Sequence, residues 1–231
     1  MMILIQARMS SRRLPGKVLQ DCAGMPMLLR VIKRCQLVKQ NIPVAIVTSD
    51  ESSDDFIFDF CLKNQIQCFR GSLHNVLNRY IKACDFYNLQ SFIRISGDSP
   101  LIDPTLIENL IKISNEGEYD LVSNVKDRTY PKGQSIEIIK VDALNRLSKI
   151  KLDKAEREHV TLGIYRNEYR FKIKSISWNE DEKYDRIQLS VDSEYDMRLI
   201  EKILMNSEFS EDTTWLEYVR LYNSVLDELV R

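Results

Sequence analysis

The side chains that first suggest chemistry are four cations crowded into one short stretch near the N-terminus. Arg8, Arg12, Arg13 and Lys17 lie there, and Gly16 precedes the lysine. A triphosphate needs such a cluster, because its charges must be neutralised before an anionic nucleophile can approach the α-phosphorus. Glycine also lets the backbone come close to an anion. The stretch therefore suggests triphosphate binding, although it lacks the spacing of a Walker loop and its charge alone would equally fit a solvated basic loop.

Two aspartates stand directly after apolar segments and could bind a metal ion. Asp98 follows an expected strand at residues 91–95, and Asp192 follows another at 188–191. Carboxylate oxygens suit Mg²⁺ that is shared with substrate phosphates. Each aspartate also has a structural alternative, because Asp98 could stabilise a turn and Asp192 could begin the helix that follows. We expect Asp196, further along that helix, at the surface.

Other reactive side chains do not indicate a different chemistry. The chain has two histidines, and its five cysteines include no C-x-x-C pair, so a zinc site is not favoured. No Ser or Cys paired with a histidine suggests a hydrolytic triad. We expect the thiols to be reduced and buried in a cytoplasmic protein.

The elements that must position these residues alternate along the first half of the chain. Short apolar runs indicate strands and amphipathic stretches indicate helices, and Asp103 suits the cap of a helix beginning at Pro104. This alternation predicts an α/β fold with a mostly parallel sheet flanked by helices, whose ligands gather at the carboxyl ends of the strands. The expected strands cover 3–5, 44–47, 67–69 and 91–95, and the expected helices cover 26–39, 53–64 and 76–87.

The pattern changes after residue 123. An extended segment at 134–140 leads into a helix at 142–149, and 171–174 is a further strand candidate. Because 134–140 is apolar at alternate positions, we expect an exposed strand that pairs with a second subunit, and hence a homodimer. Without repeats or linkers, residues 1–231 are expected to form a single domain.

The charge and hydropathy of the whole chain exclude some partners. Lysine and arginine total 33 against 34 acidic residues, a formal charge of -1. This balance gives no general attraction for nucleic acid or for an anionic membrane. No window approaches the ~18 apolar residues of a membrane span, and no signal peptide is visible, so we expect a cytoplasmic protein.

Several ordered motifs resemble those of a known enzyme family. The stretch at 6–17 is similar to the signature loop of the sugar-acid cytidylyltransferases, among them the SpsF-type spore-coat polysaccharide proteins and the CMP-Kdo and CMP-sialic acid synthetases. The similarity covers most of the chain and continues through residues 24–28, 47–49, 69–72, 94–103 and 157–161, ending near 191–192.

The resemblance implies a fold and an activity. The fold would be a Rossmann-like nucleotidyltransferase fold, which is glycosyltransferase-A-like. The activity would be Mg²⁺-dependent transfer of CMP from CTP to a sugar or sugar-acid acceptor, with release of pyrophosphate, in surface polysaccharide or glycan biosynthesis.

The resemblance also implies roles for single residues. Arg8, Lys17 and Asp98 would be catalytic, and Asp98 and Asp192 would bind the metal. The element at 159–165 is similar to a His-x-Gly-x-Tyr element of Kdo cytidylyltransferases, but its spacing differs. The nucleotide would contact Gln6, Ala7, Arg8, Arg12, Arg13, Lys17, Ser72, Arg94, Ser96 and Gly97. The acceptor would contact Arg128, Tyr130, Gln134, Glu137, Arg157 and His159. The resemblance also implies that the segment 125–145 contacts the acceptor or a second subunit.

Other functions fit the same residues. A guanylyl- or thymidylyltransferase acting on a sugar 1-phosphate would keep the same fold. The base is selected by a few contacts near Ala7, Ser72 and Arg94, and these residues do not identify the base as cytosine. A non-catalytic nucleotide-binding partner would keep the basic loop, yet pure binding does not need both Asp98 and Asp192. A structural partner in a glycan pathway could use the loop for docking. The number of metal ions stays open.

Overall fold

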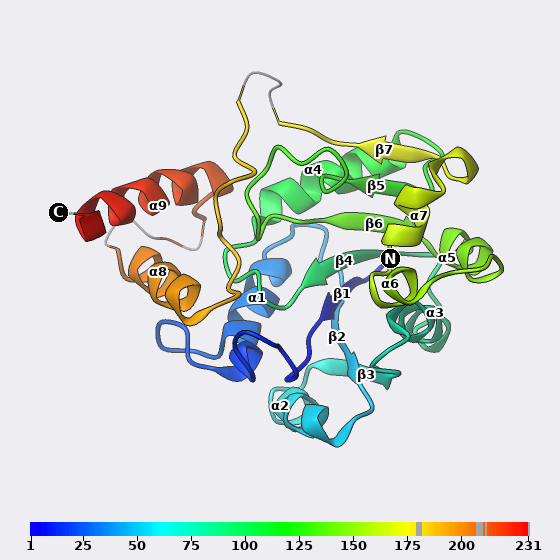
Figure 1. Cartoon of the computed structure of the whole chain (residues 1–231), viewed down its shortest axis with the longest axis horizontal. Helices are drawn as coiled ribbons and strands as arrows, with labels where there is room; N and C mark the ends of the chain where they lie inside the picture. Colours follow the sequence, from blue (N-terminus) through cyan, green and yellow to red (C-terminus); the bar gives the residue numbers. More distant parts are fainter. Residues whose placement is uncertain (179–181, 207–209, 211, 231) are drawn as a thin grey trace.

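A seven-stranded sheet forms the centre of the computed structural model, with strand order β3-β2-β1-β4-β6-β5-β7 (Figure 1). The structure describes residues 1–178, 182–206, 210 and 212–230. The strands are β1 (Ile3–Gln6), β2 (Val44–Ser49), β3 (Gln67–Gly71), β4 (Ser91–Ser96), β5 (Leu121–Ser123), β6 (Glu137–Lys140) and β7 (Ile173–Ser175).

The sheet is mostly parallel, which confirms the predicted fold class. Strand β6 alone runs antiparallel, both to β4 and to β5. The expectation of an exposed strand at 134–140 was wrong, because β6 lies inside the sheet with its backbone paired on both sides. Its apolar residues alternate because Ile138 and Ile139 enter the two cores on opposite faces. A second subunit therefore cannot pair with this strand.

Helices cover both faces of the sheet. Ile5 and Ile46 point to one face, where they pack with α1, α2, α4, α8 and α9, whereas Leu4 and Val47 point to the other, where they pack with α3, α5 and α7. The α-helices are α1 (Met27–Gln36), α2 (Asp55–Lys63), α3 (Val76–Phe86), α4 (Pro104–Asn115), α5 (Val141–Ser148), α6 (Lys154–Glu158), α7 (Leu162–Arg166), α8 (Glu194–Met205) and α9 (Trp215–Val230), and the 3₁₀ turns are η1 (Lys17–Leu19), η2 (Ser52–Asp54) and η3 (Glu168–Arg170).

Asp103 caps α4, as the sequence predicts. One carboxylate oxygen accepts hydrogen bonds from the backbone of Thr105 and Leu106, and Pro104 occupies the first turn. Such a cap stabilises a helix by about 1 kcal/mol. The other oxygen accepts from the backbone of Trp215 at 2.9 Å, so the same side chain also holds the start of α9.

None of the helices in the described ranges is both long and apolar enough to cross a membrane.

Candidate active site

The basic loop after β1 folds back on itself. The backbone amides of Ser11 and Gly16 both donate to the carbonyl of Met9, each at 2.9 Å. Gly16 has a φ of 72°, a left-handed conformation that disfavours residues with a Cβ atom, and it directly precedes η1. The turn brings Lys17 back toward the end of β1.

A buried carboxylate holds this loop from the side of β2. The Asp54 side chain is fully buried, and one of its oxygens accepts the backbone N–H of Met9 at 2.7 Å. Its other oxygen accepts the N–H of Ser49 at 3.2 Å and also the Ser49 hydroxyl. Nothing in the local sequence pattern reveals this contact, because Met9 lies 45 positions away from Asp54.

The loop forms one wall of a cavity at the carboxyl ends of β1 and β4. The cavity has a volume of about 300 Å³. Nine predicted site residues line it together, and Ser11 and Val18 join them. The predicted residues in the lining are Gln6, Ala7, Arg8, Arg12, Arg13, Lys17, Ser96, Asp98 and Asp192.

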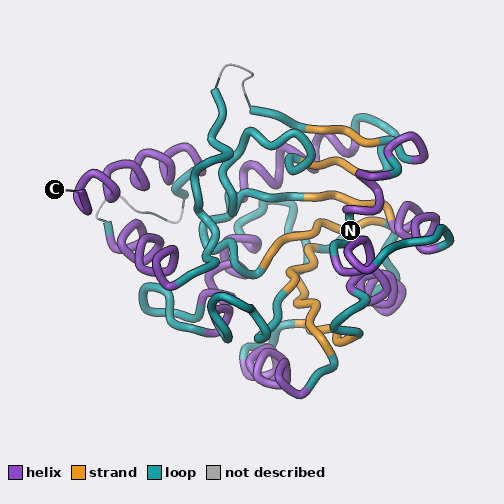
Figure 2. Tube along the Cα trace, in the orientation of Figure 1, coloured by secondary structure: helices purple, strands orange, loops and turns teal. Residues whose placement is uncertain are grey.

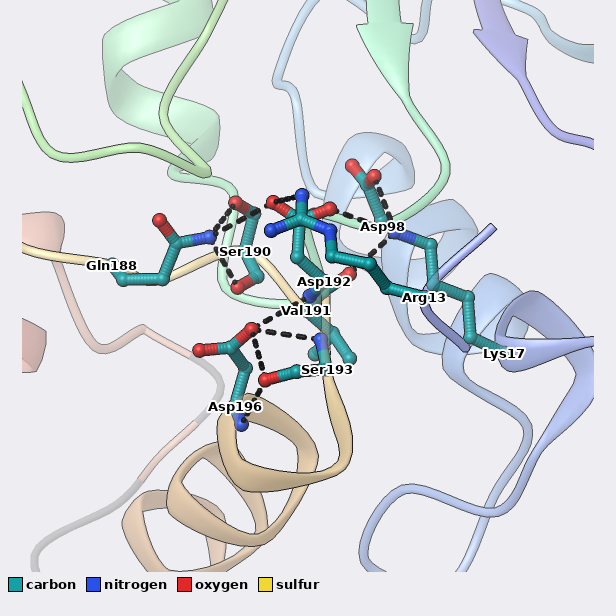
Figure 3. A network of polar contacts seen from close by, with 9 residues as sticks. All are labelled: Arg13, Lys17, Asp98, Gln188, Ser190, Val191, Asp192, Ser193 and Asp196. Carbon is teal, nitrogen blue, oxygen red and sulfur yellow. Dashed lines mark hydrogen bonds and ion pairs between the residues drawn. The ribbon is translucent and has the colours of Figure 1, made fainter. Parts of the chain in front are cut away.

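Lys17 lies between the two aspartates (Figure 3). Its buried amine donates to Asp98 Oδ2 at 2.9 Å and to Asp192 Oδ1 at 3.1 Å. A third bond, of 2.5 Å, reaches the carbonyl of Val191. The two carboxylates, which are far apart in the sequence, therefore converge on one nitrogen.

Asp192 is delivered by a loop and not by the strand expected at 188–191. The described residues between β7 and α8 form a loop (Figure 2), and an isolated bridge joins Gln188 to Lys132. The loop is fixed by a bond of 2.9 Å from the Val191 amide to the Asp98 carbonyl. Gly133 permits the close approach, because a Cβ there would lie 2.5 Å from the backbone carbon of Leu189.

Cations outweigh burial in setting the charge of Asp192. Burial raises the pKa of this carboxyl, but Lys17 and Arg13 lower the pKa by more than burial raises it. The pKa of Asp192 therefore lies below its usual range. The Arg13 guanidinium lies 2.9 Å from Asp192 Oδ2. Asp196 is not a plain surface residue as expected, because it accepts the backbone N–H groups of Asp192 and Ser193 and closes a capping box. It thereby fixes the backbone that carries Asp192.

The donor set fits a metal ion that is shared with a substrate. Within the described ranges, no three His, Cys, Asp or Glu side chains cluster closely enough to hold a metal. Asp98 and Asp192 supply two hard oxygen donors at one point, where a cationic amine already lies between them. Mg²⁺ characteristically takes one or two carboxylates and completes its shell with water and phosphate oxygens.

The sequence matches the family described as cytidylyltransferase over residues 2–222, nearly its whole length. The chain belongs to this family of enzymes. Its cavity, with a cluster of cations facing two carboxylates, lies where an α/β sheet binds ligands.

Relatives of the enzyme agree in fold and in sequence. The spore coat polysaccharide biosynthesis protein SpsF of Bacillus subtilis (strain 168) is 28% identical over 96% of this chain and 93% of that protein. An 8-amino-3,8-dideoxy-manno-octulosonate cytidylyltransferase of Shewanella sp. (strain W3-18-1) is 31% identical over 52% of this chain and 51% of that protein. A cytidylyltransferase structure from Leptospira borgpetersenii superposes with a TM-score of 0.91, at 27% identity, over 98% of this chain and 94% of that one.

Three residues predicted to contact the nucleotide lie outside the cavity lining of the enzyme. The Ser72 hydroxyl accepts the backbone N–H of Asn75, and the Ser72 carbonyl accepts from Arg79. Gly97 follows β4 and donates its N–H to the Gln6 carbonyl at 2.8 Å. Arg94 contacts a residue of the cavity lining, because it donates to Gln6 Oε1 at 3.0 Å.

Two residues predicted to contact the acceptor, Gln134 and Tyr130, are instead buried in the protein interior. Gln134 is fully buried, and its carboxamide bonds to the backbone of Leu101 and Asp103, so it cannot reach a ligand. Tyr130 is buried against Trp178 and Trp215. The resemblance to the family implied a binding role for both residues, but the packing that buries them depends on segments distant in the sequence.

The other predicted acceptor contacts are dispersed. Glu137 is buried, and one of its carboxylate oxygens accepts a hydrogen bond from Arg94. Arg128 donates to Ser135 Oγ at 2.9 Å, burial lowers its pKa, and it lines a separate cavity of about 450 Å³. Arg157 is exposed and lines a third cavity, between α3 and α5, while His159 is exposed at the end of α6.

One ion pair connects α6 with the basic loop. An Arg8 nitrogen lies 3.7 Å from a Glu158 oxygen. Both side chains are about one third exposed, so the pair is weak and can exchange its partner for a ligand. Glu158 therefore contacts a residue that lines the cavity, although the sequence did not favour it as a site residue.

Proposed function

We propose that the enzyme transfers CMP from CTP to a sugar-acid acceptor and that it uses Mg²⁺. The observation that carries this proposal is the convergence of Asp98 and Asp192 on the Lys17 amine, in a cavity that three arginines also line. Cations are needed to bind a triphosphate, and paired carboxylates are needed to hold a metal beside it. A pure binding site requires only the cations.

The residues of the cavity suit an in-line displacement. A hydroxyl oxygen of the acceptor attacks the α-phosphorus and forms the new P–O bond, while the bond to pyrophosphate breaks and its electrons leave with pyrophosphate. The hydroxyl proton passes to solvent. Arg8, Arg12 and Arg13 bind the triphosphate oxygens, and Lys17 stabilises the charge that develops during transfer. No covalent intermediate with the enzyme is required.

Asp98 and Asp192 would hold the metal. Bound Mg²⁺ supplies charge neutralisation and orientation of the phosphate oxygens. The conformation of the loop before α8, fixed by Val191 and Asp196, keeps the second carboxylate beside the first.

The proposed substrates follow from the family and its members. The family match favours cytosine over the guanine or thymine of a sugar 1-phosphate nucleotidyltransferase. Related proteins are named for octulosonate acceptors, and the SpsF relative is named for spore coat polysaccharide biosynthesis. We infer an acceptor of the sugar-acid class, in polysaccharide or glycan biosynthesis. We also propose a cytoplasmic homodimer, with an interface that does not involve β6.

Ligand-dependent thermal stability tests the nucleotide, because a ligand that binds the folded state raises the midpoint of unfolding. CTP, GTP, ATP, UTP and dTTP are each added with and without Mg²⁺, and we expect a selective shift with CTP and Mg²⁺. Pyrophosphate release with 3-deoxy-manno-octulosonate and with sialic acid then tests the acceptor class. A selective shift with GTP or dTTP, or no release with either acid, contradicts the corresponding part of the proposal.

A further inference from the structure

Polar side chains cross three neighbouring strands on the face of the sheet that α5 and α7 cover. Arg94 of β4 lies opposite Glu137 of β6, which lies opposite Ser123 of β5. Two residues away on each strand, the same face carries an apolar side chain, Phe92 on β4 and Ile139 on β6. Because a buried ion pair is seldom better for stability than apolar packing, this row suggests a role beyond the core.

The hydrogen bonds of the row have a defined direction. The Val125 amide donates to Ser123 Oγ at 3.0 Å, and the Tyr165 hydroxyl donates to Glu137 Oε1 at 2.6 Å. The hydroxyls of Ser123 and Tyr165 lie 2.7 Å apart, so Ser123 must be the donor between them, since each hydroxyl has one proton. Arg94 donates to the other carboxylate oxygen at 2.5 Å. Both oxygens of Glu137 are thereby occupied.

Arg94 also determines how the Gln6 side chain is oriented. Its second terminal nitrogen lies 3.0 Å from the Gln6 carboxamide. Arginine has donors and no acceptor, so the contacted atom must be the carboxamide oxygen. The carboxamide nitrogen of Gln6 is then the atom that does not contact Arg94. Gln6 lines the cavity together with Ser96 and Asp98. In the described part of the chain, this carboxamide makes no other hydrogen bond.

We propose that the Gln6 amide nitrogen binds an oxygen of the sugar-acid acceptor, and that Arg94, held by Glu137, is the residue that positions it. The inference rests on the proposed function. The basic loop is anchored on the β2 side, through Met9 and Asp54, whereas the Gln6 carboxamide is anchored on the β4 side. A neutral donor in the same cavity as Asp98 suits an oxygen of the acceptor near the reacting hydroxyl, while the triphosphate has the cations of the loop.

Separate Michaelis constants for the two substrates test the role of Gln6. The variant Gln6→Met removes the amide without adding charge, and Gln36→Met makes the same change at an exposed position at the end of α1. With 3-deoxy-manno-octulosonate as probe, we expect KM for the acid to rise at least ~10-fold in Gln6→Met, as for the loss of a substrate hydrogen bond. KM for CTP should stay within about 2-fold, and Gln36→Met should match the wild type. A rise in KM for CTP instead would overturn the proposal and make Gln6 a nucleotide contact.

The variant Arg94→Lys tests the positioning role. Lysine keeps the charge beside Glu137, but a single amine replaces the planar fork whose two terminal nitrogens separately reach the carboxylate and Gln6. We expect KM for the acid to rise several-fold, with KM for CTP and the melting temperature near the wild type. A fall in melting temperature with unchanged Michaelis constants would show a structural role only.

A measurement that needs no turnover separates this inference from the proposed function. The side-chain amide of Gln6 is assigned by NMR from the signal that Gln6→Met removes. We expect its shift to change on addition of the acid, and its signal to broaden in Arg94→Lys because the carboxamide can then rotate. If the wild type releases no pyrophosphate, the proposed function fails. An unaltered Gln6 signal in Arg94→Lys overturns the inference on its own.

Discussion

One cluster of ion pairs involves Asp98 in the turn after β4 and another involves Arg94 on β4, and the two clusters differ in how far solvent reaches their carboxylates. In the first, Lys17 joins Asp98 and Asp192, whose side chains are 25% and 30% exposed. In the second, Arg94 pairs with Glu137, whose side chain is 3% exposed. The exposed carboxylates can exchange their cation for a ligand, whereas the buried one has no such access. The comparison teaches that ion pairs of similar length can serve a reaction or support its framework.

The difference between the clusters also appears in the groups that surround them. The first faces a cavity lined by further cations, and the cations keep the pKa of Asp192 low in spite of burial. In the second, burial and the neighbouring Glu137 raise the pKa of the Tyr165 hydroxyl, which stays protonated and donates to that carboxylate. Losing one partner should therefore affect turnover in the first cluster and stability in the second.

The largest effect is expected from Asp98→Asn, which changes a charge in the exposed cluster and nothing else in shape. Turnover should fall about 10²- to 10³-fold or more, as when other electrostatic groups at a reacting centre are removed. Steady-state pyrophosphate release measures it, with circular dichroism to verify folding. Asp59→Asn, on the exposed side of α2, is the matched control. Wild-type turnover in Asp98→Asn would contradict the assignment of Asp98 as a metal ligand.

The buried cluster is tested by Glu137→Gln, which leaves Arg94 without its counter-charge. Breaking a buried pair by neutralising one partner is costly, and we expect the free energy of unfolding to fall by about 3 kcal/mol. Urea denaturation measures it. If Glu137→Gln is as stable as the wild type while Asp98→Asn unfolds, the distinction between the two clusters is wrong.

Asp54→Asn tests how the framework supports the exposed cluster. The carboxylate anchors Met9 of the basic loop, and losing bonds to a charged acceptor costs about 1.5–3 kcal/mol. Part of that cost should appear as a rise of roughly 10-fold in KM for CTP, because the loop is less well ordered. Asp59→Asn, at an exposed position of α2, again serves as the control. An unchanged KM for CTP would show that the loop keeps its conformation without this anchor.

The smallest effect concerns acid stability. Since the folded-state pKa of Asp192 is lowered, its pairing stabilises the fold above the unfolded pKa of about 3.9, and the contribution is lost as the pH falls through the folded value. Asp192→Asn should therefore lose less stability than the wild type as the pH falls below about 4. Chemical denaturation across that range measures the difference. If the stability of both proteins falls equally with pH over that range, Lys17 and Arg13 do not lower the pKa of this carboxyl.

Several features were readable in the sequence because their causes are local. The alternation of apolar and amphipathic segments predicted the strands up to β4 and the helices between them. The Asp103-Pro104 pair predicted the cap of α4, and the cation-rich loop predicted one wall of the cavity. These signals depend on spacing within a few residues.

Other features were missed because their causes are distant contacts. The alternate apolar residues of 134–140 looked like an exposed edge, but alternation does not reveal that helices cover both faces and that β4 and β5 pair with both edges. Gln134 looked like a ligand contact, yet its carboxamide joins backbone groups of the turn before α4. Asp54 gave no signal, since its main partner lies 45 residues earlier.

The sequence by itself determined which residue types reach the carboxyl ends of the strands, because strand ends and loops follow from local patterns. The tertiary structure alone decided which of these side chains meet. It places Asp192 beside Asp98 through a loop that is held by contacts with Gly133 and by the Val191 amide. It also buries the Glu137 side chain, whereas the side chain of Asp98 stays partly exposed to solvent. The physical reason is that the exposure of a carboxylate depends on which segments pack over it, and these segments are distant from it in the sequence.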